Sequence, residues 1–348
     1  MINTALLAEI CKVAGAPGHE QRVREIVLRE TTGLVDEIKI DNLGNLVAIK
    51  KGKERKRVMI GAHMDEIGFI VTHIDDKGFV YFHTLGGFDP KTLTAQRVII
   101  HGTEDVIGVM GGKPIHLMNA ADRAKVPTIK DYFIDTGRPK KELDKIISVG
   151  DTITRSSELI EMGDCINCKS LDNRVSVFIL IEMFREMKKT PPYDVYGVFT
   201  VQEEIGIRGA NVSSMDINPD FGFGLDTTIA WDTPGSTKQE QVSVLGDGAC
   251  IKVMDSATVC DYRMVKYMKE LSKKKKLKTQ LEILPAGGTD TAGIQRMNPG
   301  GCIAGAVSIP TRHIHQSIEM VHKKDVRGAI DLLRHSVENL HTYDWSFR

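Results

Sequence analysis

Two adjacent carboxylates, Glu203 and Glu204, follow an apolar segment near the middle of the chain. Segment 195–201 is rich in valine and aromatic residues, so it predicts a buried strand that ends just before the pair. Ligands bind at the carboxyl ends of strands in open α/β sheets. Because side chains alternate along extended backbone, one carboxylate could hold a metal ion while its neighbour moves a proton. A solvated loop is the alternative explanation for such a pair.

Residues of metal-binding type adjoin four further apolar or helix-like segments. The first segment is followed by His63 and Asp65, and the other three adjoin Asp172, Asp226 and His315 respectively. Asp65 is spaced to accept the second ring N–H of His63 and so to fix its tautomer. Asp226 is predicted to lie at the end of a strand, and Asp172 just before an amphipathic helix. Each residue has an ordinary alternative, namely a turn, a helix cap or a surface loop.

Taken together, these residues supply imidazole and carboxylate ligands but no thiolate. That ligand set is typical of a catalytic site for zinc, cobalt or manganese. Two ions need more carboxylate than one, and they share a bridging oxygen donor when they lie about 3.5–4 Å apart. Five ligands and one free glutamate base fit such a two-ion site.

Five short motifs occur together, at residues 62–68, 171–174, 201–206, 287–290 and 312–315. In this order they resemble the M42 family of metallo-aminopeptidases, which are also called tetrahedral or TET aminopeptidases and sometimes glucanases. The resemblance covers essentially the whole chain. It implies an enzyme that removes N-terminal residues from short peptides by attack of a metal-activated water.

The resemblance implies the following ligands for two divalent ions (zinc or cobalt, or else manganese): His63 and Asp226 for one ion, Glu204 and His315 for the other, and Asp172 bridging both. It also implies that Glu203 is the general acid/base and that Asp65 is the partner of His63. Asp290 matches a family motif without a role that follows from its chemistry. Many family members have an aspartate at the position of Asn173 and an aromatic residue at the position of His313. These two differences affect the expected fit of the substrate.

Two other readings of the same residues are a related two-metal amidohydrolase, such as a deacylase, and a glucanase. A glycosidase needs two carboxylates that flank a sugar and no metal. In that reading His63 and His315 would have no evident task. A non-enzymatic metal-binding protein is disfavoured by the presence of Glu203 beside Glu204.

Composition narrows the class of protein further. The chain has 348 residues, with 46 basic and 46 acidic residues, and this balance disfavours a nucleic-acid partner held by bulk charge. The run Lys273–Lys276 is expected to be a solvated helix end, and Arg208, Gln96 and Ile207 are candidates for the cleft wall. We expect no membrane-spanning segment and no signal peptide. The six cysteines include only one C-x-x-C pair, Cys165 and Cys168, so reduced thiols in a cytoplasmic protein are expected.

The order of predicted elements indicates two domains. Between residues 67 and 164 the sequence turns to short β-prone runs separated by polar turns, whereas helix-like and strand-like runs alternate after Asp172. We therefore predict an α/β catalytic domain, 1–66 and 165–348, with a mixed sheet and helices on both faces. Residues 67–164 are predicted to form an inserted β-rich domain. The family resemblance implies that this insert mediates dimerisation and that dimers assemble into a tetrahedral dodecamer.

Overall fold

An 11-stranded mixed sheet runs through the larger part of the chain in the computed structural model, which describes residues 2–347. Its main path follows the order β1-β2-β12-β3-β13-β16-β17-β11-β10, and β14 with β15 joins it through β16. These strands are β1 (Glu37–Ile40), β2 (Leu46–Lys50), β3 (Glu54–His63), β10 (Ile160–Met162), β11 (Cys165–Cys168), β12 (Tyr193–Thr200), β13 (Phe221–Ile229), β14 (Ala249–Met254), β15 (Thr279–Ile283), β16 (Ile303–Arg312) and β17 (Glu319–His322). The central strands β12, β3, β13 and β16 are parallel, so their carboxyl ends meet at one edge of the sheet.

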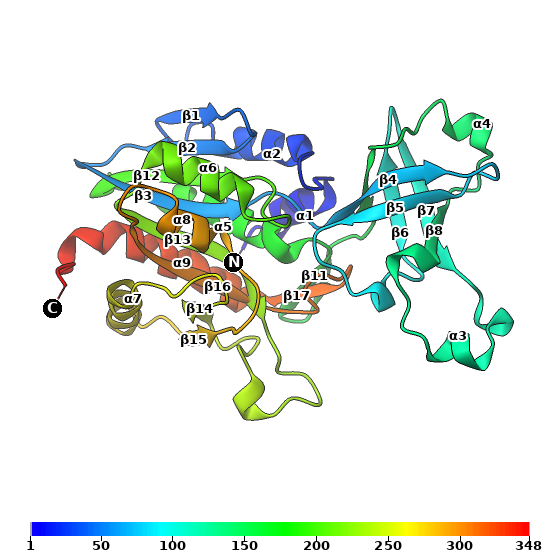
Figure 1. Cartoon of the computed structure of the whole chain (residues 1–348). Helices are drawn as coiled ribbons and strands as arrows, with labels where there is room; N and C mark the ends of the chain where they lie inside the picture. The colour runs from blue at the N-terminus through cyan, green and yellow to red at the C-terminus, as the bar shows by residue number, and fades with distance from the viewer. Residues whose placement is uncertain (1, 348) are drawn as a thin grey trace.

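Helices cover both faces of this sheet, as the sequence predicts (Figure 1). The helices of this part of the chain are α1 (Thr4–Lys12), α2 (Gln21–Thr31), α5 (Leu171–Glu186), α6 (Arg208–Ile217), α7 (Tyr262–Lys275), α8 (Asp290–Arg296) and α9 (Lys323–Asn339). Side chains alternate along β3 between the two faces of the sheet. Val58 and Ile60 belong to the core cluster that includes residues of α1, α2, α5, α7 and α9, whereas Met59 belongs to the cluster that includes residues of α6 and α8. The fold is therefore the predicted α/β class.

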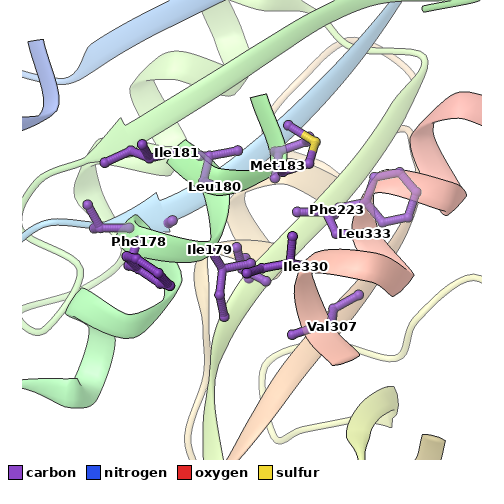
Figure 2. Close-up of a cluster of buried hydrophobic side chains, with 14 of the residues drawn as sticks. Phe178, Ile179, Leu180, Ile181, Met183, Phe223, Val307, Ile330 and Leu333 are labelled. Atoms are coloured by element: carbon purple, nitrogen blue, oxygen red, sulfur yellow. The ribbon is translucent and has the colours of Figure 1, made fainter. Parts of the chain in front are cut away.

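Helix α5 differs from the amphipathic helix predicted after Asp172. Its side chains from Leu171 to Ile181 are all buried, and only Glu182 and the last turn are partly accessible. Figure 2 shows Ile179 of α5 beside Ile330 of α9, and Phe178 of α5 and Phe223 of β13 belong to the same core cluster. A helix that is apolar around its whole circumference belongs in a core. Because α5 packs on β3 and β13 of the sheet and is flanked by α1, α2 and α9, it has no solvated face that would require polar residues.

The second part of the chain is a closed barrel of strand order β4-β5-β8-β7-β6-β9 (Figure 1). Its elements are β4 (Gly68–Ile74), β5 (Val80–Leu85), β6 (Arg97–His101), β7 (Asp105–Gly112), β8 (Tyr132–Asp135), β9 (Thr152–Arg155) and the short helices α3 (Ala120–Ala124) and α4 (Lys140–Leu143). The barrel has its own apolar core, which includes Phe69, Val98 and Ile153. All six strands fall within 67–164, but β10 of that span pairs with β11 of the large sheet, so the barrel ends earlier than the predicted boundary at 164.

Within residues 2–347, no helix combines the length and the apolar character needed to cross a bilayer. Helix α1 buries Leu6, Leu7, Ile10 and Cys11, which are the residues that predicted an ordinary amphipathic helix at the start of the chain. The lysine run lies at the exposed end of α7, as expected.

Candidate active site

The ends of β3 and β12 bring His63 and the Glu203–Glu204 pair to the same edge of the sheet. The two strands are parallel, and the last residue of β12, Thr200, lies opposite His63 in the register. Gln202 has a φ of 56°, so the chain turns sharply just before the two carboxylates. The parallel pairing explains why residues 140 positions apart in the sequence share one site.

Asp226 also lies at this edge, but in a different position from the one predicted. The sequence places it at the end of a strand, whereas β13 continues to Ile229. Pairing between β13 and β3 stops at Gly224 and Gly61. Beyond that point β13 loses its β3 neighbour, so Asp226 faces the end of β3 with its Oδ1 atom 3.7 Å from Nε2 of His63.

Asp172 occupies the centre of the group. Its Oδ1 atom lies 3.4 Å from Nε2 of His63, and its Oδ2 atom lies 3.4 Å from Nε2 of His315. The backbone at Asp172 and Asn173 is not helical although it falls inside α5, and the peptide bond between the two residues is cis. Asp172 is therefore not the helix cap considered from the sequence; its two oxygens face two different histidines.

His315 follows β16 in a turn in which both His313 and His315 have positive φ values. Its Nε2 atom is 3.4 Å from Oε2 of Glu204 as well as from Asp172. The structure thus brings together all five residues predicted to be ligands. They form two histidine–carboxylate groups that share Asp172.

The donors in this group fit a metal. The ligand atoms of His63, Asp172 and Glu204 all lie within 4.8 Å of one another. Oδ1 of Asp172 and Oε1 of Glu204 are buried and have no hydrogen-bond partner within the described part of the chain. Unpaired buried carboxylate oxygens are costly unless a cation or a donor meets them. Imidazole and carboxylate donors in this number suit zinc, cobalt or manganese.

Glu203 lies beside the ligands, with Oε2 3.8 Å from Nε2 of His63. Burial raises the pKa of its carboxyl well above the usual range. Its side chain lines a cleft of about 540 Å³ that also contains His63, Asp172 and His315. A carboxylate beside His63 and open to the cleft has the position that a general base requires.

Asp65 has a wider role than the sequence indicates. The ring Nδ1 of His63 lies 3.1 Å from the backbone oxygen of Asp65 and 3.4 Å from its carboxylate. The two oxygens of that carboxylate accept hydrogen bonds of 3.0 Å from the backbone amides of Glu203 and Glu204. Asp65 therefore joins the end of β3 to the turn after β12.

Of the other residues that the sequence singles out, Ile207 lines the cleft, whereas Arg208 and Gln96 do not. Asp290 is buried behind the cleft and accepts a 2.5 Å hydrogen bond from Thr200. Burial raises its pKa to about 7. Cys165 and Cys168 are free thiols at the two ends of β11. They are three positions apart in an extended strand, so their side chains point to opposite faces of the sheet.

Two buried charge clusters next to the site are not predicted from the sequence. Glu66 pairs with Lys169 at 2.7 Å and with Arg174 at 3.4 Å, just before Asp172. Lys252, on the cleft wall, pairs with Asp255 at 2.9 Å and Glu282 at 3.2 Å. The signal for Lys252 is a lone lysine inside the apolar run 249–254, because an unpaired charge is rarely buried.

A third feature that the sequence does not reveal is Glu319, whose carboxylate contacts the two segments that carry Asp172 and His315. Its Oε2 atom accepts a 2.9 Å hydrogen bond from the backbone amide of Asp172, and its Oε1 atom accepts one of 2.9 Å from that of His315. No local pattern in the sequence distinguishes Glu319 from a surface glutamate.

Comparisons with known proteins show which proteins this chain is similar to. A family model described as M42 glutamyl aminopeptidase matches residues 44–332. A putative aminopeptidase of Acetivibrio thermocellus is 38% identical over 329 residues, which cover 94% of this chain and 96% of that protein. The solved structure of a TET aminopeptidase from a Thaumarchaeota archaeon matches with a TM-score of 0.93 and 33% identity, over 97% and 96% of the two chains. The TET1 peptidase of Pyrococcus horikoshii, which assembles into a tetrahedron or a large octahedral shell, matches with a TM-score of 0.86 and 27% identity, over 96% and 98%.

Proposed function

Because the chain belongs to the M42 glutamyl aminopeptidase family and is a metal-dependent aminopeptidase, we propose that it removes N-terminal residues from short peptides with two divalent ions. His63 and Asp226 would hold one ion, and Glu204 and His315 would hold the other. Asp172 would be the carboxylate shared by both. The observation that carries this assignment is that the two oxygens of Asp172 each lie 3.4 Å from a different histidine. A carboxylate placed in this way suits a pair of ions about 3.5–4 Å apart.

When bound, the ions lower the pKa of an attacking water and polarise the scissile carbonyl. Glu203 accepts a proton from that water while the water oxygen forms a bond to the carbonyl carbon. Glu203 then delivers the proton to the departing nitrogen as the carbon–nitrogen bond breaks. Asp65 keeps Glu203 in place through the backbone amide of that residue. The free α-amine of the substrate would meet a metal ion or a cleft carboxylate, and that contact would restrict cleavage to the first residue.

We further propose that the chain self-associates through the barrel, as a dimer that assembles into a tetrahedral dodecamer. The self-assembly of the Pyrococcus horikoshii TET1 peptidase supports this proposal. So do large apolar side chains exposed on the barrel side of the chain, including Ile107 at 67%, Ile115 at 61% and Leu117 at 71%. Light scattering coupled to size exclusion tests it: a monomer at micromolar concentration would contradict the proposal.

The six cysteines of the chain are all free thiols, which supports a reducing compartment, and we propose the cytoplasm. Cell fractionation with an antibody tests this location. Recovery of the protein in an extracellular fraction would contradict it.

The function is tested by hydrolysis of amino-acid p-nitroanilides and short peptides, each with a free or an N-acetylated amino terminus. Metal-stripped protein is assayed alone and with zinc, cobalt or manganese added back. Metal-dependent release from free substrates only is the expected result. Release from blocked substrates only would indicate a deacylase or an endopeptidase instead. Inactivity with every metal would contradict the proposed reaction.

A further inference from the structure

Glu319 joins two segments that carry proposed metal ligands, although it lies outside the cleft. It is 2% exposed, and each of its carboxylate oxygens accepts a backbone amide: that of Asp172 at 2.9 Å and that of His315 at 2.9 Å. We propose that Glu319 is a positioning residue which sets the separation of Asp172 and His315 and thereby the affinity of the site for metal. This inference rests on the proposed function, since it takes both residues as ligands.

The sheet topology places Glu319 between the two segments. Glu319 begins β17, which pairs with β11 on one side and β16 on the other. The chain leaves β11 toward Asp172, and it leaves β16 toward His315. Glu319 is therefore the first residue of the strand that lies between the two departing segments. From this position the Glu319 carboxylate accepts hydrogen bonds from the backbone amides of both Asp172 and His315.

His315 needs such support because its backbone is unfavourable by itself. It has a φ of 63°, a region that a residue with a Cβ atom rarely adopts without local stabilisation. The Glu319 carboxylate binds its amide, and Arg155 of β9 donates a 2.9 Å hydrogen bond from Nη1 to its carbonyl oxygen. Arg155 is 4% exposed and lies over the ring of Phe88, 4.7 Å from its centroid. Both polar groups of the His315 backbone are thus held, one by the large sheet and one by the barrel.

The chain contains a matched control for the loss of such a carboxylate. Asp325 at the start of α9 is fully buried, and its two oxygens accept the backbone amides of Gly246 at 2.7 Å and Gly248 at 2.8 Å. It therefore bridges two amides as Glu319 does, but no proposed ligand is among its partners. Substitution of Glu319 by glutamine or of Asp325 by asparagine leaves one accepting oxygen for two backbone N–H groups. The loss of folding stability should therefore be similar in the two variants.

The experiment compares Glu319→Gln, Asp325→Asn and the unmodified protein. Each is stripped of metal, checked for folding by circular dichroism, and titrated with zinc in competition with a chromophoric chelator. Loss of a group that orients metal ligands typically costs about 10- to 100-fold in affinity. We expect that loss for Glu319→Gln and less than about threefold for Asp325→Asn. Equal zinc affinity in Glu319→Gln and the unmodified protein would overturn the inference, and so would equal losses in the two variants.

If Glu319→Gln does not fold, Glu319→Asp provides a second measurement, because it keeps the charge but its shorter side chain cannot reach both amides. It is expected to weaken zinc binding, and an unchanged affinity would overturn the inference. Failure of the unmodified protein to bind zinc or cleave free peptides would contradict the proposed function. Normal binding and cleavage by the unmodified protein, with unchanged affinity in the variants, would contradict only the role of Glu319.

Discussion

The Oδ1 atom of Asp65 accepts a 3.0 Å hydrogen bond from the backbone amide of Glu203. The same aspartate lies within 3.4 Å of the His63 ring through that oxygen. One buried side chain therefore positions both a proposed metal ligand and the proposed general base. Because the contact to Glu203 involves its backbone, the Glu203 side chain can be changed without releasing the turn.

Replacement of Glu203 by glutamine should abolish most turnover while leaving metal binding and folding intact. The glutamine side chain cannot take a proton, and general acid–base catalysis contributes about 10²- to 10⁴-fold. The measurement is kcat on a free-amine peptide, together with metal content per subunit. Glu204→Gln is the contrasting variant, since it should lose metal as well as activity. Native turnover by Glu203→Gln would refute the assignment.

Removal of metal should lower the melting temperature, because ions that bind only the folded state stabilise it. Binding at a free concentration 100 times the dissociation constant contributes about 2.7 kcal/mol. The measurement is thermal unfolding with and without a chelator, followed by addition of zinc. Asp172→Asn is the control, since the loss of its charged bridging oxygens should make the chelator almost without effect. A melting temperature that is insensitive to the chelator in the unmodified protein would count against a metal in this site.

The ion pair between Arg22 of α2 and Asp105 of β7 should give a small, pH-dependent stabilisation. Its atoms Nη1 and Oδ2 are 2.7 Å apart, and the Arg22 guanidinium lowers the pKa of Asp105 to about 2. An aspartate in the unfolded chain titrates near about 3.9. The stabilisation is therefore complete above about pH 4 and is lost as the pH falls toward about 2.

Both side chains of this pair are substantially exposed, 52% for Arg22 and 40% for Asp105, so solvent screening limits the contribution to less than about 1 kcal/mol. Urea unfolding of Asp105→Asn and the unmodified protein at pH 7 should reveal this difference. The difference should shrink toward zero as the pH falls through about 2. A difference that did not shrink with falling pH would exclude the ion pair as its cause.

Two glycine-to-alanine changes should have opposite effects on stability. A Cβ atom at Gly224, two residues before Asp226, would lie 1.8 Å from Oγ1 of Thr291 in α8. Overpacking of this kind costs typically about 1–3 kcal/mol. At Gly328 in α9 the nearest atom is 3.8 Å away, and alanine favours a helix over glycine by up to about 1 kcal/mol. Chemical unfolding should show destabilisation for Gly224→Ala and stabilisation for Gly328→Ala; a stable Gly224→Ala would disprove the close approach of α8 to β13.

Much of the fold follows from local patterns in the chain. The apolar run before Glu203 predicts the strand β12, and the short β-prone runs between 67 and 164 predict the strands of the barrel. The pattern fails for α5, because the spacing that predicts an amphipathic helix does not reveal how many sides of it will be covered. Burial around the whole helix depends on α9, which arrives more than a hundred residues later.

For the site, the residue types in the chain determined which side chains could bind metal and move protons, since those properties belong to imidazole and carboxylate wherever they lie. Only the tertiary structure decided how they meet. Asp226 faces His63 because β13 runs past the last residue paired with β3. Glu319 reaches the amide of Asp172, 147 positions away, because β17 lies between β11 and β16. Strand pairing and backbone hydrogen bonds join residues without regard to their separation in sequence, so no local pattern can record them.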